Sequence, residues 1–170
     1  MERINIVGCP LGEVKTHLRG YGSIFIIHDR NVGGIVERLD IEAKGIFPIE
    51  ATEERKTLST LLEIEKWLLE EGADREAFIL GVGGGITTDI AGFAASVYKR
   101  GVRFGFVPTT LLSQVDAAIG GKNGVNLDSY KNIIASDLHL PRSAGNPPLP
   151  ADPVRSLRAA QNIHNQQQGQ

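Results

Sequence analysis

Short apolar runs rich in β-branched residues alternate along this chain with segments whose apolar residues recur at helical spacing. The runs at 4–7, 23–28, 45–48, 77–81 and 104–107 are typical of buried strands. Residues 57–70, 86–98 and 110–119 carry an apolar stripe along one helical face, and Gly72 is placed to end the first of these helices. Strands that alternate with helices predict an α/β fold with a mainly parallel sheet.

Composition narrows the class of protein. The chain has 170 residues, enough for one domain with a core, and 41% hydrophobic and 22% charged residues are ordinary for a soluble protein. A net charge of −2 gives no bulk attraction to nucleic acid. The single cysteine, Cys9, excludes an internal disulfide and a multi-cysteine zinc site. With no apolar run of membrane-spanning length and no recognisable signal peptide, we expect a cytoplasmic protein without membrane or nucleic-acid partners.

The composition changes near Ala135. Residues 136–170 are rich in proline, glutamine and asparagine, contain no aromatic residue and show no helical or strand period. Such a segment buries too little apolar surface to offset the entropy of ordering it. We therefore expect a domain over residues 1–135 and a disordered or aberrant tail over 136–170, of the kind that a frameshift near the gene end would produce.

A glycine turn stands between a predicted strand and a predicted helix. Gly83, Gly84 and Gly85 would expose backbone N–H groups at the helix N-terminus, which suits a pyrophosphate. The run does not match G-x-G-x-x-G, because Ile86 occupies the sixth position counted from Gly81. The alternative is a tight turn that needs positive φ angles.

Two acids flank the apolar faces of the helices that follow these strands. Asp89 lies in the first turn after the glycines, and Asp116 follows the Pro-Thr-Thr corner, in which Thr109 or Thr110 can cap the helix. Ligands bind α/β sheets at the carboxyl ends of the strands, so both acids are candidate ligand-binding groups. Since they flank the stripes, we expect them to matter for binding and not for stability. The alternative is a solvated carboxylate favoured by the helix dipole.

Cations occur at predicted turns beside small residues. Arg100, Lys122 and Lys131 could each meet a bound anion there, although most such residues are surface charges.

The N-terminal half adds two further pairs of candidates. Asp29 and Asn31 follow a strand end, where an acid can bind ribose hydroxyls or simply cap a turn. Glu53 and Lys56 precede the helix at 57–70, where the alternative is an exposed ion pair of little energetic value.

Taken together, these motifs resemble the 3-dehydroquinate synthase family of the shikimate pathway, over about residues 20–134. Related sugar-phosphate cyclases share several of the motifs, so an enzyme similar to 2-deoxy-scyllo-inosose synthase and a non-catalytic NAD-binding fragment are alternatives. The resemblance rests on Asp29 with Asn31, Glu53-x-x-Lys56-Thr57, Gly83-Gly84-Gly85 with Asp89, Gly92-Phe93, Arg100-Gly101, Pro108-Thr109-Thr110, Gln114-x-Asp116, Gly120-Gly121-Lys122 and Lys131-Asn132.

The resemblance implies a Rossmann-like, mainly parallel sheet flanked by helices that binds NAD, followed by a helical domain that holds zinc or cobalt. It also implies a homodimer. The family enzyme is a carbon–oxygen lyase that converts 3-deoxy-D-arabino-heptulosonate 7-phosphate to 3-dehydroquinate and phosphate. NAD transiently accepts a hydride and returns it, so it is a catalytic cofactor.

The resemblance also assigns roles to residues. Arg100 resembles an arginine that reaches the substrate phosphate across the dimer interface. Asp116, Lys122, Lys131 and Asn132 would contact the substrate or the nicotinamide. The NAD-binding set would be Asp29, Asn31, Glu53, Lys56, Gly83, Gly84, Gly85, Asp89, Thr109 and Thr110.

The chain departs from the family pattern after Ala135. The family's zinc ligands, one glutamate and two histidines, lie beyond the position of Asn132, and the surroundings of His139 and His164 match no family motif. We therefore expect no metal site in this chain. Because hydride transfer would then lack a Lewis acid, we also expect no turnover from the chain alone.

Overall fold

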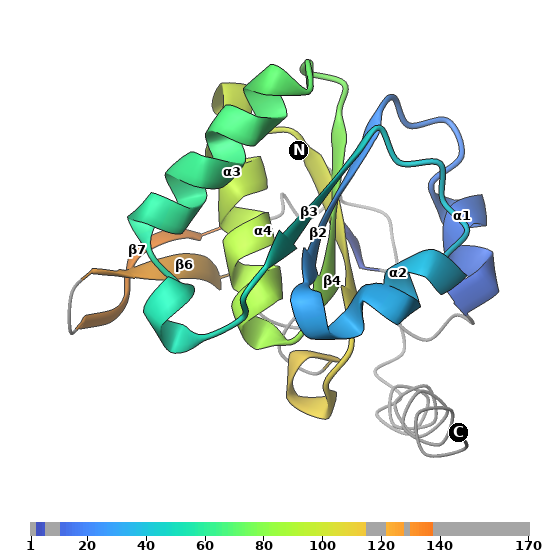
Figure 1. The fold of residues 1–170 in the computed structure, drawn as a ribbon. Coiled ribbons are helices and arrows are strands. Elements are labelled where there is room, and N and C mark those ends of the chain that lie inside the picture. The colour runs from blue at the N-terminus through green and yellow to red at the C-terminus, as the bar shows by residue number, and fades with distance from the viewer. Residues whose placement is uncertain (1–2, 6–10, 115–121, 128–129, 138–170) are drawn as a thin grey trace, which may run out of the picture.

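A five-stranded parallel sheet forms the centre of the protein (Figure 1). The structure is a computed structural model that describes residues 3–5, 11–114, 122–127 and 130–137. Its strand order is β1-β5-β4-β2-β3, and every neighbouring pair is parallel, so the predicted α/β fold is confirmed. The strands are β1 (Arg3–Asn5), β2 (Ile24–Asp29), β3 (Gly45–Ile49), β4 (Phe78–Gly83) and β5 (Arg103–Pro108).

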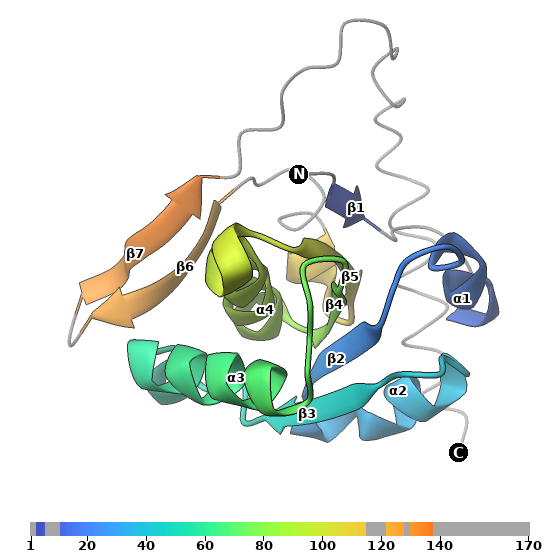
Figure 2. The same ribbon diagram turned by 90° about the horizontal axis from the view of Figure 1, so that it is seen from above.

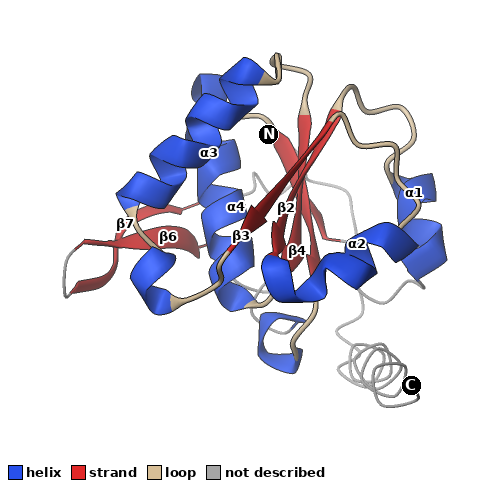
Figure 3. Cartoon of the chain, in the orientation of Figure 1, coloured by secondary structure: helices blue, strands red, loops and turns tan. Residues whose placement is uncertain are grey.

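Helices cover both faces of this sheet (Figures 1 and 2). The short helices α1 (Val14–His17) and α2 (Gly33–Arg38) lie on one face, and α3 (Leu58–Glu70) and α4 (Gly85–Val97) lie on the other. Figure 3 shows the same layers coloured by secondary structure. Residues 111–114 are also helical. The described residues also form the 3-10 turns η1 (Leu11–Glu13), η2 (Arg30–Val32), η3 (Glu53–Arg55) and η4 (Tyr98–Arg100).

Alternate residues of the central strands enter two separate apolar layers. Phe25, Ile27 and Ile79 belong to the layer under α3 and α4. Ile26 and Leu80 belong to the layer under α1 and α2. All five side chains are 0–1% exposed. A parallel sheet covered on both faces has no polar side, which is why its strands appear in the sequence as unbroken apolar runs.

A hairpin outside the parallel sheet was not predicted. Strands β6 (Lys122–Leu127) and β7 (Tyr130–Asp137) pair antiparallel beside α3 and α4 (Figure 2). The prediction that Lys122 and Lys131 lie at turns is therefore wrong, because each belongs to a strand. Strand β7 also continues two residues beyond Ala135, whereas residues 138–170 of the expected tail lie outside the described residues.

Close contact with α4 fixes the hairpin in place. A Cβ atom added at Gly92 on α4 would lie 2.4 Å from the Asn123 Nδ2 atom of β6, so only glycine allows this approach. Val125, on the same strand, is fully buried in the layer under α3 and α4. The hairpin is thus part of the core, although it is not part of the parallel sheet. None of the helices in the described ranges has the length and hydropathy of a membrane-spanning segment.

One acid on α3 is poorly solvated. Among the described residues, the Oε1 atom of Glu65 is buried without a hydrogen-bond partner, and burial raises the pKa of this carboxyl to about 7. The charge of Glu65 also contributes to raising the pKa of Tyr98, after the larger effect of burial. The Tyr98 hydroxyl donates a hydrogen bond of 2.9 Å to the Ala73 carbonyl, which closes this end of the core.

We predict that Glu65→Gln stabilises the protein above neutral pH. The folded-state pKa of Glu65 lies above its unfolded value, so the wild-type free energy of unfolding falls as pH rises from about 4.5 to 7. Because the side chain is only half-buried, we expect a gain of about 1 kcal/mol at pH 8 and almost none at pH 4. Urea unfolding at both pH values measures this difference. A gain of equal size at both would contradict the assignment, and Glu70→Gln, at an exposed position of the same helix, is the control.

Candidate functional site

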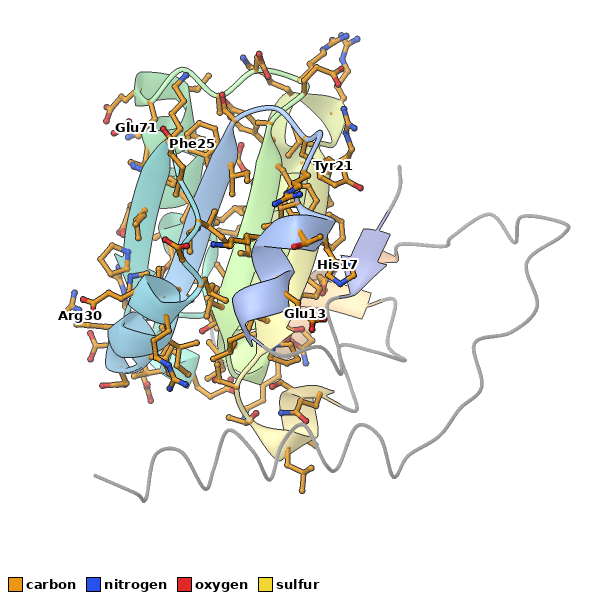
Figure 4. All side chains as sticks on the ribbon, turned by 90° about the vertical axis from the view of Figure 1, so that its right-hand side faces the viewer. Glu13, His17, Tyr21, Phe25, Arg30 and Glu71 are labelled. Atoms are coloured by element: carbon orange, nitrogen blue, oxygen red, sulfur yellow. The ribbon has the colours of Figure 1, made fainter. Side chains whose placement is uncertain are left out.

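The chain direction diverges between β2 and β4. From β2 the chain passes through α2 to β3, and from β4 it passes through α4 to β5 on the opposite side of the sheet (Figure 2). Strands β2 and β4 are neighbours, with His28 opposite Val82, so Asp29 and Gly83 end adjacent strands. In open α/β sheets, ligands bind in the crevice outside the carboxyl ends at this switch point. In Figure 4 the labelled Arg30 lies at the carboxyl end of the strands, and the labelled Phe25 lies toward their opposite end.

The glycine turn lies on the β4 side of this switch point. A Cβ atom at Gly83 would lie 2.6 Å from the Thr87 Oγ1 atom, so packing against α4 requires glycine there. Gly84 is the N-cap of α4 and offers no side-chain cap to the first-turn N–H groups. Gly85 is exposed, and a Cβ atom added there would meet none of the described residues within 4 Å. The helix N-terminus therefore faces open space with backbone donors that the helix does not satisfy.

The end of β5 supports this turn. The Thr109 backbone N–H donates to the Gly83 carbonyl at 2.9 Å. Thr110 caps the helical residues that follow, since its Oγ1 atom accepts from the Ser113 N–H at 3.2 Å. Its methyl group would lie 3.2 Å from a Cβ atom at Gly84, which limits the size of the residue at that position. The two threonines thus hold the glycine turn in place and limit the size of the residue at position 84.

On the β2 side, Asp29 begins the turn η2. Its Oδ1 atom accepts from the Asn31 N–H at 2.9 Å and from the Asn31 Nδ2 atom at 3.1 Å. Asp29 therefore caps the turn, which was the alternative to ribose binding in our interpretation of the sequence. The cap holds a partly exposed carboxylate at the strand end beside the glycine turn.

A buried cation joins two other candidates. The Lys56 side chain is 5% exposed, and its Nζ atom contacts the Asp89 Oδ2 atom at 2.5 Å and the Asn132 Oδ1 atom at 2.7 Å. Lys56 follows β3, Asp89 lies in α4, and Asn132 lies in β7. The alternative interpretation, an exposed ion pair of Glu53 and Lys56, is therefore wrong for Lys56. The ion pair also gives Asp89 a structural role that its position beside the apolar stripe did not predict.

The remaining candidates are distributed around this network. Lys131 is exposed, with its Nζ atom 3.9 Å from the Glu53 Oε2 atom. Arg100 lies beyond the far end of α4, which is about 20 Å long, and so it is not close to the glycine turn of its own chain. It adopts φ 73°, in the left-handed region. Asp116 and the side chain of Lys122 lie outside the described residues.

Sequence reasoning missed one residue of this network. Asn126, on β6, contacts the Glu53 side chain at 3.0 Å and the Asn132 backbone at 2.9 Å. An asparagine in a glycine-rich segment is typical of a turn. Only its short spacing from Lys131 and Asn132 could have indicated that it lies near these candidate residues. In the described ranges, no group of three or more His, Cys, Asp or Glu side chains could hold a metal ion.

The sheet and its switch point define the class of protein: a Rossmann-like α/β protein with a glycine turn at the carboxyl end of its sheet. Comparison with known proteins identifies the family. The sequence model described as 3-dehydroquinate synthase N-terminal matches residues 46–143, more than half of the chain. The chain belongs to the 3-dehydroquinate synthase family.

Similar curated proteins are longer than this chain. The 3-dehydroquinate synthase of Pyrococcus abyssi is 52% identical over 144 residues, covering 81% of this chain and 42% of that protein. The enzyme of the same name from Thermococcus kodakarensis is 52% identical over 113 residues, covering 62% of this chain and 33% of that protein. The chain thus spans 33–42% of the length of these two relatives.

Solved structures show the same fold. A 2-deoxy-scyllo-inosose synthase complexed with carbaglucose-6-phosphate, NAD⁺ and Co²⁺ is 31% identical, with a TM-score of 0.65 over 74% of this chain and 36% of that one. The 2-epi-5-epi-valiolone synthase of Streptomyces hygroscopicus, with NAD⁺ and Zn²⁺ bound, is 30% identical, with a TM-score of 0.64 over 80% of this chain and 39% of that one.

The buried ion pair leads to a stability prediction. Asp89→Asn would leave the buried Lys56 ammonium with neutral acceptors only, and we expect a loss of about 1–3 kcal/mol in the free energy of unfolding. Lys56→Met should cost less, because Asp89 is 29% exposed and can be hydrated. Urea unfolding of both variants measures the two losses. A larger loss for Lys56→Met than for Asp89→Asn would refute the view that the uncompensated ammonium dominates.

Proposed function

We propose that this chain binds NAD at the carboxyl edge of its sheet, as the nucleotide-binding part of a 3-dehydroquinate synthase. The observation that carries the proposal is the open N-terminus of α4, which lies at the switch point between β2 and β4. The family match and the two relatives at 52% identity support the particular enzyme. Its reaction would convert 3-deoxy-D-arabino-heptulosonate 7-phosphate to 3-dehydroquinate and phosphate, which is carbon–oxygen lyase chemistry.

The described residues fit NAD. The open space at Gly85 leaves room for a pyrophosphate against the first-turn N–H groups of α4. Asp29 lies across the switch point, where a carboxylate can accept hydrogen bonds from ribose hydroxyls. Glu53 and Lys56 would flank the same cofactor from the loop before α3. Thr109 and Thr110 would border it from the end of β5.

The chain's own residues would orient the substrate beside this cofactor. When bound, NAD supplies a hydride acceptor for a substrate hydroxyl and later returns the hydride. Lys131 and Asn132 lie on β7, next to the Lys56 network, so they would hold the substrate at the nicotinamide end. By resemblance to the family, Asp116 and Lys122 would also contact the substrate. No step is assigned to a metal, because the described residues contain no suitable ligand group.

Arg100 would act from a second copy of the chain. In its own chain it lies beyond the far end of α4, so it cannot reach the glycine turn. In a homodimer, a guanidinium from the partner could bind the substrate phosphate and stabilise the charge that develops as phosphate leaves.

A related cyclase reaction is the second candidate. The 31% identity to a 2-deoxy-scyllo-inosose synthase complexed with carbaglucose-6-phosphate, with a TM-score of 0.65, supports a hexose 6-phosphate as an alternative substrate. Saturation-transfer NMR with the NAD-bound chain distinguishes the candidates. Selective binding of the heptulosonate phosphate supports the 3-dehydroquinate synthase, and selective binding of glucose 6-phosphate supports the other cyclase.

We predict that Gly85→Ala stabilises the fold and weakens NAD binding. The added methyl group meets no atom of the described residues within 4 Å, and alanine reduces the conformational entropy of the unfolded chain, which stabilises the fold by about 0.4–1 kcal/mol. The same methyl group would occupy the space proposed for the pyrophosphate, so we expect an affinity loss of about tenfold or more by calorimetry. Gly12→Ala, at an exposed glycine that is equally free of contacts, is the control. Unchanged affinity in Gly85→Ala would remove the pyrophosphate from this turn.

A further inference from the structure

We propose that Asn126 is a positioning residue that sets the cofactor side and the substrate side of the site relative to each other. The inference rests on the proposed function, because it gives Asn126 a role through Glu53, Lys56 and Asn132. Asn126 itself would touch neither NAD nor substrate. Its side chain and backbone instead connect the hairpin β6–β7 to the loop that precedes α3.

Each of three polar groups of Asn126 bonds to a different candidate residue. Its backbone N–H donates to the Lys56 carbonyl at 2.8 Å. Its Nδ2 atom donates to the Glu53 Oε2 atom at 3.0 Å, with a longer contact of 3.4 Å to the Glu53 carbonyl. Its Oδ1 atom accepts from the Asn132 N–H at 2.9 Å. The residue is 9% exposed, so water does not readily replace these partners.

The acceptor bond supports an unusual backbone conformation. Asn132 adopts φ 53°, in the left-handed region that few residues other than glycine occupy. Holding its N–H on Asn126 offsets part of the cost of this conformation. It also fixes the direction of the Asn132 side chain, whose Oδ1 atom contacts the Lys56 Nζ atom at 2.7 Å. Asn126 thus restrains Lys56 in two ways. It bonds directly to the Lys56 backbone carbonyl, and it positions Asn132, which accepts a hydrogen bond from the Lys56 ammonium.

The donor bond sets the position of the Glu53 carboxylate. The exposed Glu53 carboxylate also forms an ion pair with Lys131, at 3.9 Å. Because exposed ion pairs contribute little, this contact restrains the carboxylate only weakly. A bridge between Thr57 and Asn126 places the two segments side by side in parallel. A carboxamide supplies a donor and an acceptor on two separate atoms, whereas an ionised aspartate only accepts and alanine does neither. These contacts make the amide chemistry of Asn126, and not its volume, the required feature.

The first test replaces the amide in the full 170-residue chain. Asn126→Asp keeps the acceptor for Asn132 and places a carboxylate about 3 Å from Glu53, near Lys131 and the Lys56–Asp89 pair. We expect NAD to bind about tenfold more weakly at pH 8. The affinity should approach that of the wild type toward pH 5, because two close carboxylates share a proton. Asn126→Ala should weaken binding at both pH values by a similar factor.

The second test exchanges the two groups. In the double variant Glu53→Gln with Asn126→Asp, an amide at 53 can donate to a carboxylate at 126. If the two substitutions acted independently, their losses of NAD affinity would multiply. We expect the double variant to bind NAD about fivefold or more tightly than this product predicts. A double variant that is no better than additive overturns the proposal, as does an Asn126→Asp chain with wild-type affinity at pH 8.

Hydrogen exchange separates this inference from the proposed function. In the wild type we expect the Asn132 amide to be protected without any ligand, and in Asn126→Ala we expect that protection to be lost. If the wild type binds no NAD, the proposed function fails, and the exchange rate and the coupling energy in urea unfolding still decide the positioning claim. If Asn126→Asp does not fold, the exchanged double variant should fold. Its failure to do so would also overturn the claim.

Discussion

The buried ammonium of Lys56 is the charge on which the rest of the site depends. A cation that is almost fully removed from water is stable only when oxygen atoms surround it. Here they come from Asp89, 33 residues away in the sequence, and from Asn132, 76 residues away. One side chain therefore joins the loop after β3, the helix α4 and the hairpin β6–β7. Each of these segments contributes candidate site residues, and a shift of any one of them would break an oxygen contact of the buried ammonium.

This pairing also has an electrostatic consequence for the glycine turn. Asp89 lies in the second turn of the helix whose N-terminus is proposed to bind a pyrophosphate. An unpaired carboxylate there would repel the phosphates and offset the attraction of the helix dipole. The Lys56 ammonium, 2.5 Å from the Asp89 carboxylate, neutralises that charge at its source. The positive end of α4 is thus left to act on an anion, and the acid remains available as a hydrogen-bond acceptor.

The parallel sheet could be predicted because its strands are buried on both faces. An unbroken apolar run as short as the one at β2 is typical of a buried strand, and the glycines after β4 predicted a turn between a strand and a helix. The hairpin could not be predicted in this way, because its polar and glycine-rich sequence resembles a loop. The burial of Lys56 depends on that hairpin, so local sequence suggested an exposed pair with Glu53. Asn126 was missed for the same reason, since its partners come together only after the hairpin packs on Gly92.

The central claim is that a pyrophosphate binds at the N-terminus of α4, and amide chemical shifts measure this directly. With ¹⁵N-labelled chain titrated with NAD, the account predicts that the largest shift changes fall on the amides of Gly84, Gly85 and Ile86. Smaller changes should follow at Asp29 and Thr109, which border the turn. Changes concentrated at the other end of α4, around Lys99 and Arg100, or no saturable change at all, would contradict the account.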